Sequence, residues 1–193
     1  MSEKLTVELL VSAYSQGFFP MPDETHHKIK WYRPDPRAII PLQGFHTSHS
    51  LKRLIKKNIF TVSFDTAFRQ VMEKCSEHPQ TWISSEFIDI YTELFERGFA
   101  HSVEIWEGNN LVGGVYGPSI NGAFFGESMF HRSRDASKVA LFHLVEKLKQ
   151  SRFLLFEVQF LTPHLSSLGA IEISDHEYMQ RLFSALKQNT SWE

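Results

Sequence analysis

Apolar residues recur along this chain with helical spacing in some segments and with strand-like spacing in others. The helical spacing predicts helices over about 6–16 and 48–57, and further helices that begin near Asp65, Ser85, Asp135 and Ser174. Apolar runs and alternations predict strands over about 38–42, 59–64, 101–106, 111–117, 123–130 and 153–160. This order predicts an α+β fold with a mostly antiparallel sheet and a late strand that follows a crossover helix.

The run FFGESMF at residues 124–130 places one carboxylate among large apolar side chains. We expect this run to form a buried strand. A bare charge is costly to bury, so the carboxylate of Glu127 must be paired, protonated or directed into a cleft. Glu127 is therefore a candidate site residue. The alternative is an edge strand from which Glu127 points to solvent.

The segment after this run predicts a helix packed close to the end of the strand. Asp135 can accept a hydrogen bond as an N-cap, and Ala136, Val139 and Leu144 lie on one apolar face. A strand, a short loop and a packed helix in this order commonly hold ligands near the strand end. The last helix is expected to open with a capping box at Ser174.

The length and composition of the chain are sufficient for a substantial core, and they argue against a disulfide-stabilised protein and a membrane-spanning protein. The chain has 193 residues, of which 42% are hydrophobic, and its single cysteine, Cys75, excludes an internal disulfide framework. No apolar run approaches the roughly 20 residues that span a bilayer, and the first residues lack the pattern of an export signal. We therefore expect a cytoplasmic protein.

The distribution of charge is more informative than the net charge of −2. Lys52 and Lys56 are four residues apart, as are Arg53 and Lys57, so a helix over this segment presents adjacent cationic ridges. This surface is a candidate contact for phosphate groups. The alternative is an ordinary solvated face of an amphipathic helix.

Two other patterns are weaker candidates for sites. His26-His27 and His46 with His49 have spacings that could bind a metal, but no cysteine or carboxylate completes a zinc signature, so we expect surface histidines and no metal site. The pair Gly113-Gly114 lacks the lysine and hydroxyl residue of a phosphate loop and lies inside a predicted strand. Close approach of another segment explains the two glycines more simply.

Several short motifs stand in order over nearly the whole chain. They are AY at residues 13–14, G at 17, FP at 19–20, PDPR at 34–37, TWI at 81–83, AHSVE at 100–104, VGGVYG at 112–117, FFGESMF at 124–130, ASK at 136–138 and SLGA at 167–170. Together they resemble the leucyl/phenylalanyl-tRNA–protein transferase family. The resemblance implies a small N-terminal α/β domain, residues 1–64, joined to a GNAT-like acyltransferase domain, residues 65–193.

The reaction implied by the resemblance moves Leu or Phe, with Met as a third candidate, from aminoacyl-tRNA to the α-amino group of a protein that begins with Arg or Lys. The product is marked for degradation through the N-degron pathway. The donor ester is already activated, so the enzyme has to orient the amine, remove its proton and stabilise the oxyanion. The resemblance implies no metal, no organic cofactor, no membrane and a monomeric enzyme.

Three residues are expected to act on the reacting groups. Gln159 matches a family glutamine that, with a neighbouring aspartate, helps to activate the amine, and Glu157 stands at the aspartate position. Residues at alternate positions of a strand face the same side, so this pair is geometrically possible. Glu127 matches the family glutamate that can hold a substrate ammonium group.

The resemblance also implies binding residues for the donor. Phe124, Met129 and Leu141 match positions that line the pocket for the aminoacyl side chain, and a flexible methionine suits both Leu and Phe. Trp82 corresponds to a tryptophan that stacks on the terminal adenosine. Met21 stands where the family often has a second tryptophan, so stacking is expected to be weaker or one-sided. Basic residues of the family match the segment of Lys52, Arg53, Lys56 and Lys57, which we expect to contact the tRNA acceptor stem.

Two departures leave alternatives open. Asp175 stands where the family usually has an arginine, which exchanges a cation for an anion near the site, and Glu157 replaces an aspartate. A related transferase with another donor or acceptor, for example an acidic N-terminus, and a non-catalytic protein that binds tRNA or N-termini are the two rival readings. The sequence alone does not determine donor preference, acceptor charge or oligomeric state.

Overall fold

The computed structural model describes residues 5–22, 29–78 and 81–192. Its helices are α1 (Val7–Ser15), α2 (His49–Lys56), α3 (Phe68–Ser76), α4 (Ser85–Glu96), α5 (Ala136–Gln150), α6 (Pro163–Ser167) and α7 (Asp175–Leu186), with a 3₁₀ turn, η1, at Leu42–Gly44. Its strands are β1 (Phe19–Pro22), β2 (Ile29–Tyr32), β3 (Arg37–Ile39), β4 (Thr61–Phe64), β5 (Ala100–Glu107), β6 (Asn110–Ile120), β7 (Ala123–Phe125), β8 (Ser128–His131), β9 (Leu155–Gln159) and β10 (Ile171–Ile173).

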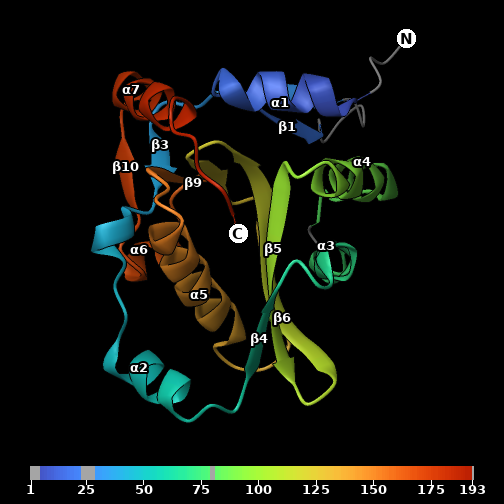
Figure 1. Ribbon diagram of the computed structural model, residues 1–193, viewed down its shortest axis with the longest axis vertical. Coiled ribbons are helices and arrows are strands. Elements are labelled where there is room, and N and C mark those ends of the chain that lie inside the picture. Colours follow the sequence, from blue (N-terminus) through green and yellow to red (C-terminus); the bar gives the residue numbers. More distant parts are fainter. Residues whose placement is uncertain (1–4, 23–28, 79–80, 193) are drawn as a thin grey trace.

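The strands form one large mixed sheet and one small antiparallel ribbon (Figure 1). The large sheet has the order β10-β3-β9-β7-β6-β5-β4, and β8 pairs with β6 beside this path. All its pairs are antiparallel except β7 with β9, which are parallel and are joined through α5. The predicted α+β class, the mostly antiparallel sheet and the late crossover strand are confirmed.

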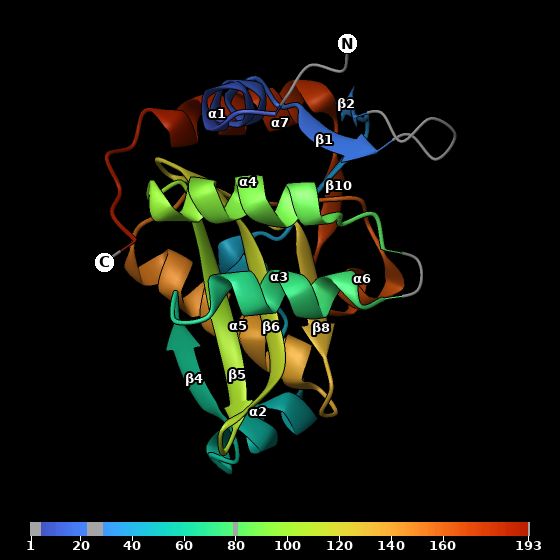
Figure 2. The same ribbon diagram turned by 90° about the vertical axis from the view of Figure 1, so that its right-hand side faces the viewer.

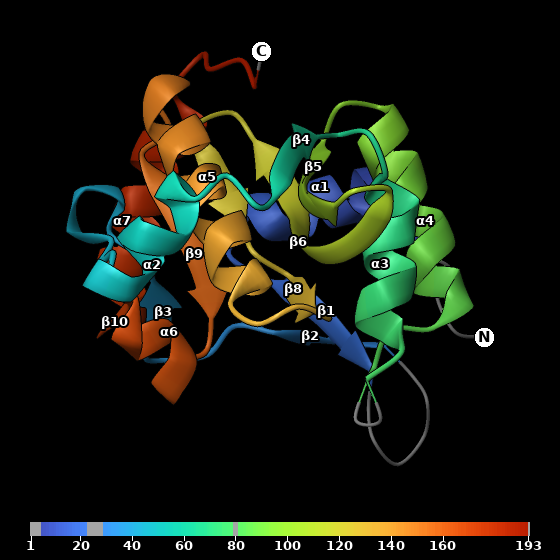
Figure 3. The ribbon, with the colours of Figure 1, turned by 90° about the horizontal axis from the view of Figure 1, so that it is seen from below.

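Helices cover both faces of the sheet, so two hydrophobic cores form. Figures 1 and 3 show α3 and α4 on one side of the sheet and α5 with α2 on the other. Figure 2 shows α1 and α7 together at one end of the molecule and α2 at the opposite end. Tyr14 of α1 and Phe125 of β7 belong to the first core, whereas Phe124 of β7 and Leu141 of α5 belong to the second.

The predicted strand over 123–130 is interrupted, which corrects the interpretation of Glu127 as a residue inside a strand. Phe124 and Phe130 are six residues apart, yet they belong to opposite cores, because one extra residue lies between β7 and β8. The result is a β-bulge opposite Gly117. A side chain at Gly117 would overlap the carbonyl oxygen of Phe125, so only glycine fits there. Glu127 lies in the bulge.

The two predicted helix caps differ in outcome. Ser174 caps α7 by accepting a hydrogen bond from Glu177 N, as expected. Asp135 precedes α5 but makes no capping hydrogen bond, since its backbone has a left-handed φ of 63°. Its carboxylate instead accepts a hydrogen bond from Lys138 Nζ at 2.8 Å. The prediction that Asp135 caps the helix is therefore wrong.

The short elements β1, β2, α6 and β10 were not predicted, because segments of three to five residues carry too little periodicity. The division into residues 1–64 and 65–193 stays a prediction; β3 and β4 lie before that boundary and pair with strands after it. None of the helices in the described residues combines the length and apolar character that a membrane crossing requires.

Candidate active site

The three residues expected to act on the reacting groups lie next to one another. Gln159 Nε2 donates a hydrogen bond to Glu127 Oε1 at 3.0 Å. The backbone N–H of Gln159 donates to Glu157 Oε1 at 2.8 Å. The bulge between β7 and β8 and the end of β9 thus bring two carboxyl groups to Gln159, one to its side-chain amide and one to its backbone N–H. Their chemical roles stay predictions.

Gln159 ends β9 in a conformation that is unusual for its residue type. Its φ is +62°, in the left-handed region that glycine favours and other residues rarely adopt. The carboxylate of Glu157 receives the N–H of Gln159 in this conformation. Strained backbone of this kind persists where surrounding contacts hold it, and it is enriched at functional sites.

Glu157 is paired with a buried cation. Arg37 Nε lies 2.9 Å from Glu157 Oε1, and both side chains are 0% exposed. Arg37 also donates to Gly17 O at 2.8 Å, and its guanidinium lies over the rings of Phe19 and Tyr178. Burial raises the pKa of Glu157, while Arg37 opposes that shift. Sequence reasoning missed Arg37 as a site residue, although it had appeared in the PDPR motif.

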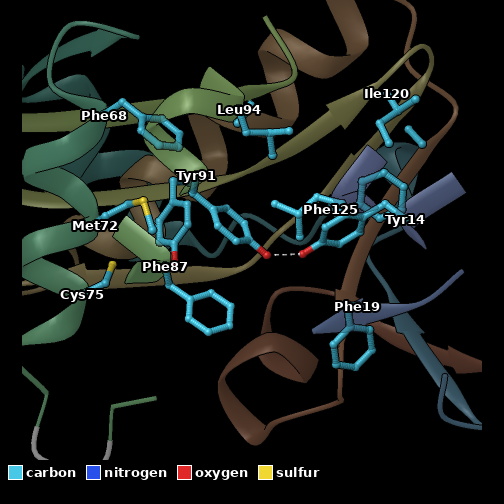
Figure 4. Packing of buried hydrophobic residues seen from close by; sticks show 14 of the residues in the cluster. Tyr14, Phe19, Phe68, Met72, Cys75, Phe87, Tyr91, Leu94, Ile120 and Phe125 are labelled. Carbon is cyan, nitrogen blue, oxygen red and sulfur yellow. Dashed lines mark hydrogen bonds between the residues drawn. The ribbon is translucent and has the colours of Figure 1, made fainter. Parts of the chain in front are cut away.

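Two buried tyrosines complete the hydrogen-bond network. Tyr14 Oη donates to Glu127 Oε1 at 2.5 Å, and Tyr14 Oη and Tyr91 Oη are 2.6 Å apart (Figure 4). Because the Tyr14 proton is directed at Glu127, Tyr91 is the donor to Tyr14. Neither tyrosine had been expected in the site, since a tyrosine on an apolar helix face is indistinguishable from a core residue by pattern alone.

Glu127 is held in an environment that favours its neutral form. Burial, with a smaller contribution from the charge of Glu157, raises the pKa of Glu127 from 4.5 to about 8, against the hydrogen bonds from Tyr14 and Gln159. Glu127 Oε2 is buried and has no hydrogen-bond partner among the described residues. No described residue uses the acceptor capacity of this oxygen.

A cleft of about 510 Å³ lies between α3 and β8. Two of the predicted donor-binding residues, Trp82 and Met129, line it, and so does Ser128, which follows Glu127 in the chain. Lys74 and Arg132 also lie in its wall, where both form ion pairs with Glu77. The cleft therefore combines an aromatic ring and a flexible thioether with a residue adjacent to Glu127 in the chain.

The other predicted donor-binding residues lie elsewhere. Phe124 and Leu141 are 0% and 2% exposed in the core under α5, and Phe124 packs against Phe156 and Trp192. Neither lines the described cleft. Met21, on β1, is half-buried against the first core. The roles of all three in donor binding stay predictions.

The basic helix is formed as expected, at the far end of the molecule from α1 (Figure 2). Leu51 is buried and anchors α2 to the core under α5. The four cationic side chains, Lys52, Arg53, Lys56 and Lys57, are exposed. Because α2 and α3 lie on opposite sides of the sheet, a nucleic acid that contacts both α2 and the cleft has to reach both sides.

Asp175 is not an uncompensated anion. Its carboxylate receives two hydrogen bonds from Arg33, at 2.8 and 2.6 Å, and its backbone N–H donates to Asp35 Oδ1. The Arg33 guanidinium holds the pKa of Asp175 below its usual range. Asp175 stands where the family usually has a cation, and the charge of its carboxylate is compensated by Arg33.

Histidine pairs do not form a metal site in the part of the chain that can be inspected. His26-His27 lies outside the described residues. Among the described residues, no group of three or more His, Cys, Asp or Glu is arranged to hold a metal ion.

Solved structures with some similarity to this fold include a ribosomal-protein-alanine N-acetyltransferase of Brucella melitensis biovar Abortus and L-PGS of Bacillus licheniformis. The first has a TM-score of 0.37 at 13% identity and covers 49% of this chain and 74% of that one. The second has a TM-score of 0.44 at 11% identity and covers 81% of this chain and 53% of that one. Similarity at this level carries no argument about activity.

Sequence comparison is decisive. The model of the leucyl/phenylalanyl-tRNA protein transferase family matches residues 39–183, and the model of its N-terminal domain matches residues 3–35. The chain is 52% identical to the leucyl/phenylalanyl-tRNA–protein transferase of Herpetosiphon aurantiacus, with 97% of each chain covered. It is 50% identical to that of Gloeobacter violaceus, with 94% of each chain covered. The chain belongs to the leucyl/phenylalanyl-tRNA–protein transferase family.

Proposed function

We propose that this protein transfers Leu or Phe, with Met as a third candidate donor, from aminoacyl-tRNA to the α-amino group of proteins that begin with Arg or Lys. The observation that carries the proposal is the Glu127–Gln159 hydrogen bond, at 3.0 Å, in a buried network. The residue that follows Glu127 in the chain lines the same cleft as Trp82 and Met129. The network supplies a proton acceptor and an orienting amide where an amine would attack.

The chemistry requires a neutral amine. The α-amino group of a protein has a pKa of roughly 7.7–8.0, so much of it is protonated at neutral pH. A carboxylate with a pKa of about 8 can accept that proton at almost no energetic cost, and the pKa of Glu127 lies there. We assign Glu127 Oε2, which has no partner among the described residues, as the acceptor.

The bond changes then follow in order. The amine nitrogen attacks the carbonyl carbon of the ester and loses a proton, and the tetrahedral intermediate expels the 3′ oxygen of the terminal ribose, which takes up that proton. Gln159 can orient the reactants through its carboxamide, since orientation supplies a large share of the rate in such reactions. Because the ester is already activated, the reaction does not need a metal or an organic cofactor.

Donor recognition is divided between two regions. Met129 contacts the aminoacyl side chain and Trp82 stacks on the terminal adenosine, both in the cleft. The exposed cations of α2 contact phosphates of the acceptor stem. Phe124 and Leu141 act as a second layer behind the donor pocket, because both are buried in the core.

Basic N-termini remain the favoured acceptors. The ion pair of Arg33 with Asp175 compensates the unusual charge at position 175, so that substitution gives no reason to prefer acidic N-termini. We further propose that the enzyme acts as a monomer in the cytoplasm, where charged tRNA and nascent proteins are available.

The test uses purified protein, radiolabelled Leu-, Phe- and Met-tRNA, and peptides that begin with Arg, Lys, Asp or Glu. Transfer of Leu or Phe to the Arg and Lys peptides supports the proposal. Transfer to acidic peptides only would indicate a transferase with changed acceptor specificity. Binding of tRNA without transfer to any peptide would indicate a non-catalytic binding protein and would overturn the proposal.

A further inference from the structure

We propose that Arg37 is a positioning residue for the transfer reaction, and that it acts through Glu157 on Gln159. The proposal rests on the proposed function. It assigns to Arg37, which touches neither substrate in that scheme, control over the conformation from which Gln159 reaches Glu127.

Arg37 is fixed by contacts from three parts of the chain. Its Nη2 donates to Gly17 O at 2.8 Å, directly after α1. Its guanidinium carbon lies 4.3 Å from the ring centroid of Tyr178 on α7 and 5.0 Å from that of Phe19 on β1. The side chain is 0% exposed, so these contacts hold it without competition from water. Arg37 therefore offers Nε to Glu157 from a fixed position.

Glu157, held in place by Arg37, in turn fixes the backbone of Gln159. A single oxygen, Glu157 Oε1, accepts both from Arg37 Nε at 2.9 Å and from Gln159 N at 2.8 Å. The second hydrogen bond is made while Gln159 has a φ of +62°. From that backbone, Gln159 Nε2 reaches Glu127 Oε1 at 3.0 Å. An unbroken chain of contacts thus joins Arg37 to the proposed proton acceptor.

A purely structural role explains this arrangement less well. A buried ion pair rarely stabilises a protein more than well-packed apolar residues of the same volume would, because both charges lose their hydration. A carboxylate that accepts a main-chain N–H in a rare conformation, however, determines geometry in a way that apolar packing does not. Arg37 favours the ionised form of this carboxylate, against the burial that raises its pKa.

The first test compares Arg37→Met with wild type at a temperature where both are folded. We expect kcat for Leu transfer to fall by about 10- to 100-fold, as small misplacements of reacting groups cause. The KM for Leu-tRNA and the affinity for uncharged tRNA should change by less than about twofold. Leu182→Ala, a buried change on α7, is the control for lost stability. Equal kcat in Arg37→Met and Leu182→Ala would overturn the proposal.

A double-mutant cycle tests whether Arg37 acts through Glu157. Glu157→Gln keeps an oxygen that can accept from the N–H of Gln159. If Arg37 acts through Glu157, the Arg37→Met/Glu157→Gln variant should lose no more activity than the more impaired single variant. A loss equal to the product of the two single losses would show independent roles and would overturn the proposal.

A spectroscopic readout separates this proposal from the proposed function. Protein labelled with [¹⁵N]glutamine reports the backbone amide of Gln159 without donor or acceptor. We expect this resonance to shift, and its amide hydrogen to exchange faster, in Arg37→Met but not in Leu182→Ala. An unchanged Gln159 amide would overturn the positioning role, whether or not wild-type protein transfers Leu. A changed amide in a protein without transfer activity would leave only the proposed function refuted.

Discussion

The hydroxyl of Tyr14 donates a 2.5 Å hydrogen bond to Glu127, a residue 113 positions further along the chain. Helix α1 is therefore part of the environment that sets the charge of this carboxylate. A hydrogen bond to a carboxylate favours its ionised form, so the bond from Tyr14 lowers the pKa of Glu127 against the effect of burial.

Removal of this bond should change the pH dependence of transfer. In Tyr14→Phe the pKa of Glu127 rises further, so the acidic limb of the profile of kcat against pH should move to higher pH. The loss in stability should be about 0.5–1.5 kcal/mol below pH 8, where Glu127 is mostly neutral, and greater above it. Tyr116→Phe is the matched control, since the Tyr116 hydroxyl is buried without a partner among the described residues. Identical pH profiles for Tyr14→Phe and wild type would contradict the assignment of Glu127.

Glu127 should also make stability depend on pH. Its pKa is about 8 in the folded chain and near 4.5 in an exposed setting, so the folded state binds one more proton between these values. The free energy of unfolding should therefore fall as pH rises from about 4.5 to about 8, with a slope of at most about 1.4 kcal/mol per pH unit. Chemical denaturation over this range should show a shallower fall for Glu127→Gln. Glu73→Gln, an exposed change on α3, is the control.

The basic face of α2 should control the affinity for tRNA and its dependence on salt. Replacing Lys52, Arg53, Lys56 and Lys57 with Gln should weaken binding and flatten the plot of log affinity against log salt, because fewer counterions are released. Arg69→Gln/Arg97→Gln removes cations beside α3 and α4, on the other side of the sheet, and should leave the slope nearly unchanged. An unaltered slope in the quadruple variant would exclude α2 from the interface.

Met129 should matter for the donor side chain more than for tRNA itself. Met129→Ala enlarges the cleft. The variant should therefore lose part of the roughly 1.5–3 kcal/mol of binding free energy that burial of the aminoacyl side chain contributes. Transfer from Leu- and Phe-tRNA should fall, while binding of uncharged tRNA stays close to wild type. Met72→Ala removes a methionine that is 1% exposed in the first core and should reduce stability without changing donor use. Unchanged transfer with both donors would make Met129 a core residue only.

Most of the fold follows from local patterns, because its longer helices and strands bury regular faces. The interruption at Glu127 does not follow from them. It depends on the approach of Gly117 to Phe125, a contact between two strands that no single segment encodes. A glycine in each of two facing runs, Gly117 and Gly126, is the available signal, and it indicates only close approach.

The residues of the candidate site also fall into those that the sequence indicates and those that it does not. Glu127 stands out in sequence because it is a lone carboxylate in an apolar run, and Glu157 and Gln159 stand out only through the family resemblance. Arg37 and Tyr14 could not be placed by pattern, since pairing of β3 with β9 and packing of α1 bring them to the site from distant parts of the chain. The periodicity of a segment does not indicate which distant segment it will pair with or pack against.

The bidentate ion pair of Arg33 with Asp175 constrains how this chain can diverge from its relatives. An arginine at position 175 would face Arg33 across the same short gap, and an uncharged residue at 33 would leave the carboxylate of Asp175 without its partner. A sequence that carries only one of the two changes would therefore be less stable than one that carries both or neither. Positions 33 and 175 are therefore expected to covary in evolution, so that a sequence inherits both partners or neither.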